Sequence, residues 1–216
     1  MSAARLLSRR LFPGALALAL SGCASMFVSP PPKYLFRLAP QNSWPPGLPH
    51  RSGQLLIDLP LAAPGLDSKR IALSKSATLI DYFADAEWAD RLPLLVKTAL
   101  LTAFENTRAI TALDRETLGL RADFILAPEI RHFEAEYRGG SGPPDIRVAI
   151  EVKLVRMLHR EVIGQQLFER RVPAAANDLP AIVAAFETAL GAVIREIVLW
   201  TLSHPLSAGR EAAKAS

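Results

Sequence analysis

The sequence has little that would support disulfide formation, nucleic-acid binding or nucleotide binding. One cysteine among 216 residues leaves no intramolecular disulfide framework. After residues 1–22 no apolar stretch reaches 18 uncharged residues, so we expect no further membrane-spanning helix. The same part of the chain has no run rich in Lys and Arg, which argues against nucleic-acid binding. The phosphate-binding motif G-x-x-x-x-G-K-[ST] is also missing, so the chain is not expected to bind a nucleotide itself.

Candidate metal ligands are sparse. The four histidines have no metal-ligand spacing such as H-x-x-x-H between them. The best metal candidate is the alternating set His132, Glu134 and Glu136, which could line one face of a strand. A solvated polar face is the favoured explanation, because an expected β-bulge next to His132 would disturb the alignment.

Two other patterns could suggest catalysis, but a structural role explains each better. Gly140-Ser141-Gly142 is followed by two prolines and an expected strand, which indicates a hairpin loop. A nucleophile elbow would instead need a strand, a sharp turn and then a helix. Asp81 and Asp85 lie shortly before an expected helix, and capping explains them better than acid–base catalysis. We therefore expect a protein that is not an enzyme and that has no cofactor.

The tetrad Leu20-Ser21-Gly22-Cys23 has the pattern of a bacterial lipobox. Three arginines precede it as a positive n-region, and residues 11–20 form an apolar h-region. Ten residues make about 15 Å of helix, half of the ~30 Å hydrocarbon core, so this run is too short to span a bilayer. We expect a signal peptide at residues 1–22, cleavage between Gly22 and Cys23, and N-palmitoyl and S-diacylglycerol groups on Cys23.

An ordinary secretory signal or an uncleaved anchor is the alternative. Acylation is favoured because the only cysteine of the chain stands at the lipobox position. Loss of the three arginines would lower the formal net charge from +4 to about +1. In enteric bacteria an Asp after the lipidated cysteine retains a lipoprotein in the inner membrane. By resemblance to that rule Ala24 favours the outer membrane, facing the periplasm, over the inner membrane.

Proline and hydropathy patterns divide the mature chain. Residues 23–33 are expected to form a lipidated tether, because their three consecutive prolines favour an extended polyproline conformation. A single folded domain is expected over residues 34–206, with a disordered tail at residues 207–216. The proline-rich stretch at residues 40–49 is expected to form a surface loop.

Alternating hydropathy predicts short strands in the first half of the domain, at residues 34–38, 54–59, 70–74 and 78–83. A helix is expected to follow, with Asp90 as its N-cap, Pro93 in its first turn and its end near Asn106. Its apolar residues recur at three- and four-residue spacing, which predicts one buried face.

Three long strands and a helix are expected in the second half. The first strand covers residues 124–137, and its apolar residues change parity near Arg131–His132, which predicts a β-bulge. The second strand, residues 146–154, alternates aliphatic and charged residues, and the third ends near Val172. The last helix is expected to be capped by Asp178 and to end at His204. Together these elements predict an α+β fold with two layers, a largely antiparallel mixed sheet and two main helices on one face.

An aromatic cluster precedes the first expected helix. Tyr82, Phe83 and Trp88 alternate with charged residues, and Arg91 follows them. Tyr, Trp and Arg are typical hot spots of protein–protein interfaces, so these four residues are candidate partner contacts. The favoured alternative is that Phe83 and Trp88 belong to the edge of the hydrophobic core.

Several segments together resemble a known family. They follow the lipobox and the tether in this order: Tyr34–Leu38, Leu55–Pro60, Tyr82–Phe83, Glu87–Leu92, Ala122–Leu126, Ile130–Glu134 and Ala185–Phe186. The chain resembles the ABC-type transport auxiliary lipoproteins, the lipoprotein partners of MCE-type lipid transporters, including that of the paraquat-inducible operon. The proline-rich insertion at residues 40–49 departs from the family pattern.

The resemblance implies a non-enzymatic accessory subunit. Such lipoproteins are encoded beside an ATPase, a permease and a periplasmic MCE protein, and they assist the movement of phospholipids or other hydrophobic molecules across the envelope. The implied role here is docking of the MCE protein at the outer membrane, and a homo-oligomer around the transport path is compatible with it. Two alternatives remain open at this stage: a carrier that binds lipid between helix and sheet, and a structural envelope lipoprotein assisting another assembly.

Overall fold

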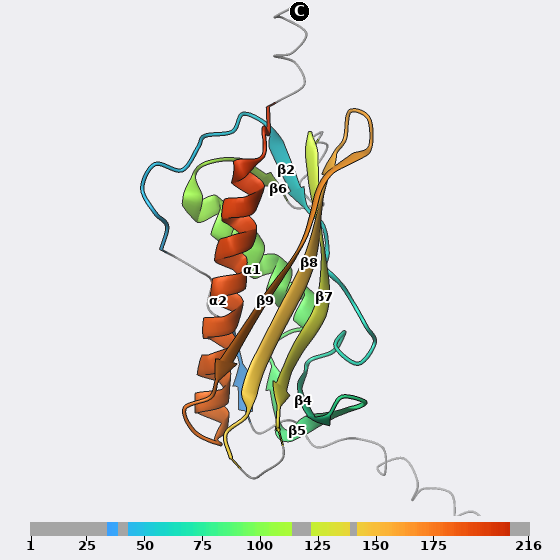
Figure 1. The fold of residues 1–216 in the computed structure, drawn as a ribbon, viewed down its shortest axis with the longest axis vertical. Helices are drawn as coiled ribbons and strands as arrows, with labels where there is room; N and C mark the ends of the chain where they lie inside the picture. Colours follow the sequence, from blue (N-terminus) through green and yellow to red (C-terminus); the bar gives the residue numbers. More distant parts are fainter. Residues whose placement is uncertain (1–33, 39–42, 114–121, 139–141, 208–216) are drawn as a thin grey trace, which may run out of the picture. The chain divides into compact units, whose positions relative to one another are not determined.

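The structure, a computed structural model, describes residues 34–38, 43–113, 122–138 and 142–207. Figure 1 shows two helices on one face of a mixed sheet. This arrangement confirms the α+β fold expected from the sequence. Several predicted features lie outside the described residues: the signal peptide, Gly22, Cys23 and Ala24, the tether up to residue 33, Ser141, and the tail from residue 208.

Strands form most of the domain. The first six are short to medium in length: β1 (Tyr34–Phe36), β2 (Gln54–Ile57), β3 (Leu61–Ala62), β4 (Arg70–Ser76), β5 (Leu79–Trp88) and β6 (Thr111–Leu113). The long ones are β7 (Phe124–Glu136), β8 (Asp145–Arg156) and β9 (Glu161–Pro173). The helices are α1 (Leu92–Thr107) and α2 (Leu179–Ser203). Within the described residues, neither helix combines the length and apolar character needed to cross a bilayer.

Strand β7 organises the sheet. Along one edge it pairs in antiparallel fashion with β8, which in turn pairs with β9. Along its other edge it pairs in parallel with three short strands in succession, β2, β3 and β4. The hairpin of β4 and β5 and the parallel strand β1 then extend the sheet. The predicted β-bulge is confirmed, because the β7–β8 register shifts between Ile130 and His132.

The hydrophobic core lies between the sheet and the two helices. The alternating aliphatic residues of β8 and the apolar stripe of α2 are buried there, as their spacing predicts. Three aromatic rings fill its centre: Phe133 and Phe186 stack at 4.9 Å between centroids, and Trp88 meets Phe186 edge-on at 5.4 Å. Each of these side chains is fully enclosed, so this part of the core is densely packed.

The two helices begin differently. The Asp178 carboxylate accepts a hydrogen bond from the Ala181 amide at 2.9 Å, which confirms it as the N-cap of α2. The prediction that Asp90 caps α1 is wrong, because the N-cap is Arg91 and no side chain caps this helix. Asp90 stands one residue too early, and its carboxylate accepts from the adjacent Arg91 amide at 2.7 Å instead.

Candidate docking surfaces

Tyr82, one of the predicted partner contacts, fixes a loop to strand β5. Its hydroxyl donates to the Gly65 carbonyl at 2.9 Å, and the Arg70 guanidinium lies 3.5 Å from the centre of its ring. A cation over an aromatic face is attractive, so both contacts orient the ring. The β3–β4 loop (residues 63–69) is therefore held against β5 by Tyr82.

Arg91 makes a second attachment to the same loop. Its guanidinium donates to both carboxylate oxygens of Asp67, with the shortest distance at 2.5 Å. The backbone supports this contact, because the Leu92 amide donates to the Ser68 carbonyl at 3.0 Å. Arg91 thus connects the start of α1 to the β3–β4 loop. Its side chain is exposed but already has a structural role in this ion pair.

Trp88 is not a surface residue. It is 1% exposed and packs edge-on against Phe133 and Phe186, while Phe83 is half-buried against the same core. The core alternative is therefore confirmed for Trp88, and its assignment as a partner contact is wrong. The physical reason is that β5 continues to Trp88 and places the indole beneath α2.

The length of β5 also corrects the interpretation of Asp81 and Asp85. Both lie within the strand, not in a turn before the helix, so capping does not explain them. The Asp81 carboxylate accepts from the neighbouring Tyr82 amide at 2.8 Å, and both aspartates are exposed.

The outer face of β7, β8 and β9, away from the helices, carries a network of ion pairs. Glu136 accepts hydrogen bonds from Arg138 at 3.1 Å and from Arg171, and it lies 3.5 Å from Arg147. Glu169 joins the same arginines, at 2.8 Å from Arg147 and 3.2 Å from Arg171. Three guanidinium groups thus surround two carboxylates, Glu136 of β7 and Glu169 of β9, which lie on either side of β8.

This network shifts the titration of its carboxyl groups. Burial alone would raise the pKa of Glu136, but hydrogen bonds from Arg138 and Arg171 and the charges of Arg171 and Arg147 outweigh burial. The pKa of Glu136 therefore lies below its usual value. The hydrogen bond from Arg147 is the main reason that the pKa of Glu169 is also lowered.

The same face continues beyond the bulge. Arg131 lies 2.7 Å from Glu129 and donates to Glu151, which also accepts from Gln165. These hydrogen bonds lower the pKa of Glu151, with the Arg131 contact as the largest cause. The outer face is thus a fixed mosaic of both charges, and exposed Leu167 of β9 lies within it opposite Glu151.

The structure brings together only part of the predicted metal triad. His132 Nδ1 lies 2.7 Å from Glu134 Oε1, and Glu134 Oε2 accepts from the Phe133 amide at 3.0 Å. Glu136 is instead bound by the arginines. In the parts of the chain that the structure covers, no group of three or more His, Cys, Asp and Glu is placed to hold a metal ion.

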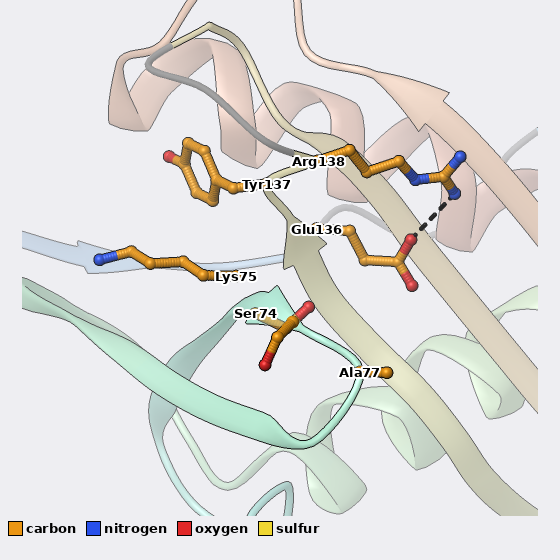
Figure 2. A pocket seen from close by; sticks show the side chains of 7 residues that line it. Ser74, Lys75, Ala77, Glu136, Tyr137 and Arg138 are labelled. Atoms are coloured by element: carbon orange, nitrogen blue, oxygen red, sulfur yellow. Dashed lines mark hydrogen bonds and ion pairs between the residues drawn. The ribbon is translucent and has the colours of Figure 1, made fainter.

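A pocket of about 230 Å³ lies where β7 ends beside the β4–β5 hairpin. It is lined by Ser74, Lys75, Ser76, Ala77, Glu136, Tyr137 and Arg138. Figure 2 shows Arg138 extended towards Glu136 and Lys75 extended in another direction. The charged groups do not converge on one point, and the volume is below the ~300–1,000 Å³ of ligand pockets. This pocket does not have the features of a small-molecule site.

Exposed apolar side chains at the two ends of the sheet were missed by the sequence analysis. Leu79 and Ile80 lie at the tip of the β4–β5 hairpin, and Leu158 and Val162 lie at the β8–β9 hairpin. The one available signal was a pair of adjacent aliphatic residues at a turn, Leu79-Ile80, which breaks the strand alternation.

Comparison with known proteins agrees with this architecture. The model of the family described as "ABC-type transport auxiliary lipoprotein component" matches residues 34–198, which covers nearly all of the described elements. The chain belongs to this family. It is a family of transport auxiliary lipoproteins and not a known enzyme family. Membership of this family therefore identifies the chain as a lipoprotein that is connected with transport.

Three individual proteins share the domain at 14–28% identity. The chain is 27% identical over 175 residues to an uncharacterized protein of Bradyrhizobium diazoefficiens, covering 81% of this chain and 46% of that protein. It thus spans less than half the length of this curated relative. The crystal structure of a Xanthomonas campestris protein has a TM-score of 0.72 and 28% identity, and the match covers 83% of this chain and 99% of that one. A second crystal structure, of an uncharacterized protein, shares the fold with a TM-score of 0.61, 14% identity, and 79% and 99% coverage.

Proposed function

We propose that this protein is the non-catalytic docking subunit of an MCE-type ABC transporter that moves phospholipids or other hydrophobic molecules across the cell envelope. The observation that carries the proposal is the family match over residues 34–198. In this role the ATPase and permease perform the energy-dependent steps, and the lipoprotein holds the periplasmic MCE protein at a membrane.

The anchoring half of the proposal assigns acylation to Cys23 and places the protein on the periplasmic side of the outer membrane. The lipobox at residues 20–23 and Ala24 support it. Two or three acyl chains together hold a protein on a bilayer far more firmly than one, because each buried CH₂ contributes ~0.8 kcal/mol.

The docking half is supported by the polar mosaic of the outer face. The side chains of Arg131, Glu151 and Gln165 are held by one another, so they lose little freedom when a partner covers them. Fixed charges of both signs favour a partner with the complementary pattern and disfavour others. This face is the surface that we assign to the MCE protein.

The lipid-carrier alternative has no support from the packing. A carrier needs an apolar space beneath Leu95, Phe104, Phe186 and Leu190. Leu95 is half-buried and the other three side chains are fully buried. The space at Phe186 is occupied by the rings of Trp88 and Phe133.

The test is in-cell crosslinking of the tagged full-length protein, followed by mild detergent extraction and mass spectrometry. Recovery of an MCE protein together with its permease or ATPase is the expected result. A charge-reversed Arg131→Glu variant should recover much less MCE protein, whereas Lys97→Glu, on helix α1, should recover as much as the wild type. Recovery of only cell-wall or unrelated outer-membrane proteins would contradict the transport role without contradicting the acyl anchor.

The anchor has its own test. Cys23→Ala should release the protein from the membrane fraction, and flotation in a density gradient measures this directly. A Cys23→Ala protein that still floats with outer-membrane vesicles would contradict acylation as the means of attachment.

A further inference from the structure

The β4–β5 hairpin presents apolar side chains to solvent at one end of the sheet. Every residue from Lys75 to Ile80 is exposed, and Leu79 and Ile80 are 54% and 46% exposed. Figure 2 shows the Lys75 side chain extended away from Glu136. In the described part of the chain the Lys75 ammonium makes no hydrogen bond or ion pair. The tip therefore combines two aliphatic side chains with one uncommitted cation.

This hairpin lies at the end of the domain towards which the amino end of β1 points. Strand β1 runs parallel to β5, with Tyr34 opposite Ala86. The amino end of β1, at Tyr34, therefore points towards the side on which β5 begins, at Leu79. Cys23 precedes Tyr34 by eleven residues, which span at most about 40 Å when fully extended. A bilayer that holds Cys23 is within reach of the hairpin.

The opposite end of the sheet also has exposed apolar side chains, at the β8–β9 hairpin. This second hairpin lies far from the β4–β5 hairpin. Strand β8 is 12 residues long, about 40 Å. Its Asp145 end pairs with Glu136 near the β4–β5 hairpin, and its Arg156 end pairs with Phe124. Leu158, 60% exposed, follows that second end. It is a matched apolar residue at the end of the domain remote from the tether.

We propose that the tip of the β4–β5 hairpin rests on the phospholipid surface to which Cys23 is attached. Leu79 and Ile80 enter the boundary between headgroups and acyl chains, and Lys75 lies among anionic headgroups. Aliphatic side chains gain burial at that boundary, and a nearby lysine adds attraction to anionic lipid. The inference rests on the acylation of Cys23 in the proposed function.

A lipid surface fits this tip better than the surface of a protein. Leu79 and Ile80 are consecutive residues of a strand, so their side chains point to opposite faces of the hairpin. A flat protein surface would cover one of them and leave the other in water. A fluid lipid interface surrounds a protruding tip and covers both. The contact would hold the sheet upright, with the β8–β9 hairpin about 40 Å from the membrane.

A fluorescence experiment on the full-length acylated protein tests the contact. Because Cys23 is the only cysteine and its thiol is acylated, a second cysteine is the only one that reacts with a thiol label. Leu79→Cys and, as the matched control, Leu158→Cys are each labelled with an environment-sensitive fluorophore. The proteins are reconstituted in vesicles of phosphatidylethanolamine and phosphatidylglycerol that contain nitroxide-labelled lipid. We expect blue-shifted emission and a loss of fluorescence at position 79, and neither change at position 158.

The outcomes separate the two proposals. If the protein floats with the vesicles but the fluorophore at position 79 is as exposed to solvent as that at position 158, the hairpin contact is overturned. The acyl anchor is not contradicted by that result. A blue shift at position 79 without loss of fluorescence to the lipid nitroxide would indicate that a second copy of the chain covers the hairpin, and it would also overturn the contact with lipid. Protein that does not float would instead contradict the acylation itself. A double variant, Leu79→Ser with Ile80→Ser, should leave flotation unchanged but restore trypsin cleavage after Lys75 on vesicles to the rate seen in detergent.

Discussion

The ring of Phe186 on α2 stacks on the ring of Phe133 on β7, with the two planes inclined by 15° and the centroids 4.9 Å apart. This contact joins the last helix to the central strand of the sheet. Phe186→Ala should lower the free energy of unfolding by about 3–5 kcal/mol, because it removes a large buried side chain and leaves a cavity. Denaturant unfolding followed by circular dichroism measures the change. Leu158→Ala, at an exposed site, should change it by less than about 0.5 kcal/mol.

Gly164 on β9 leaves room for the side chains at the carboxyl end of α2. A Cβ atom at this position would lie 2.8 Å from both Trp200 Cζ2 and His204 Nε2. Gly164→Ala should therefore destabilise the protein by about 1–3 kcal/mol, the usual cost of overpacking. Gly142→Ala is the control, since no atom of the described residues lies within 4 Å of its Cβ position. Equal melting temperatures for the two variants would contradict this account.

The arginine network around Glu136 should make stability depend on pH in the acidic range. The pKa of Glu136 is lowered in the folded state by Arg138, Arg171 and Arg147, although burial opposes them. Its contribution is therefore fully present above the unfolded-state pKa of about 4.3 and is lost as the pH falls through the folded-state pKa. Glu136→Gln should be less stable than the wild type at pH 7, and the difference should narrow below about pH 4.

The measurement is the free energy of unfolding at several pH values between 7 and 3. Glu105→Gln is the matched control, because Glu105 is exposed on α1 and makes no ion pair among the described residues. A difference between wild type and Glu136→Gln that stays constant down to pH 3 would show that the arginines do not stabilise the charged form.

The two aspartates before the helices should differ in their effect on stability. Asp178→Ala removes a side-chain cap from α2 and should cost about 1 kcal/mol. Asp90→Ala should cost less, because Asp90 accepts only from the adjacent Arg91 amide and caps nothing. Thermal unfolding of both variants decides between the structure and the sequence-based assignment of Asp90 as an N-cap.

The elements that could be predicted from sequence are those with a strong local signal. The alternation from Ile146 to Leu154 predicted β8 and its buried face, and a change of parity predicted the bulge near Arg131. The cap at Asp178 was also correct, because the Asp, the following proline and the apolar stripe all indicate one helix start.

The incorrect or missing predictions depend on contacts between distant segments. Trp88 has charged neighbours in sequence, so the sequence left both a partner contact and the core edge open for it, and the pairing of β5 places its indole in the core. The parallel pairing of β2, β3 and β4 with β7 has no local signature, because β-propensity does not specify a partner. The arginine network likewise needed the register of three strands, which fixes the positions of Arg147 and Arg171 around Glu136.

The position of β7 has a consequence for the order in which the molecule can form. Gln54 meets its partner Asp123 across a separation of 69 residues, and β3 and β4 also pair with β7. A chain delivered into a compartment from its amino end must keep these strand edges unpaired until β7 emerges. Such long-range parallel pairing is slow and exposed to aggregation. The protein should therefore depend on a holdase chaperone that covers the edges of β2, β3 and β4 during export. The chaperone should no longer be needed once the β7–β8 hairpin has emerged and can pair with these strands.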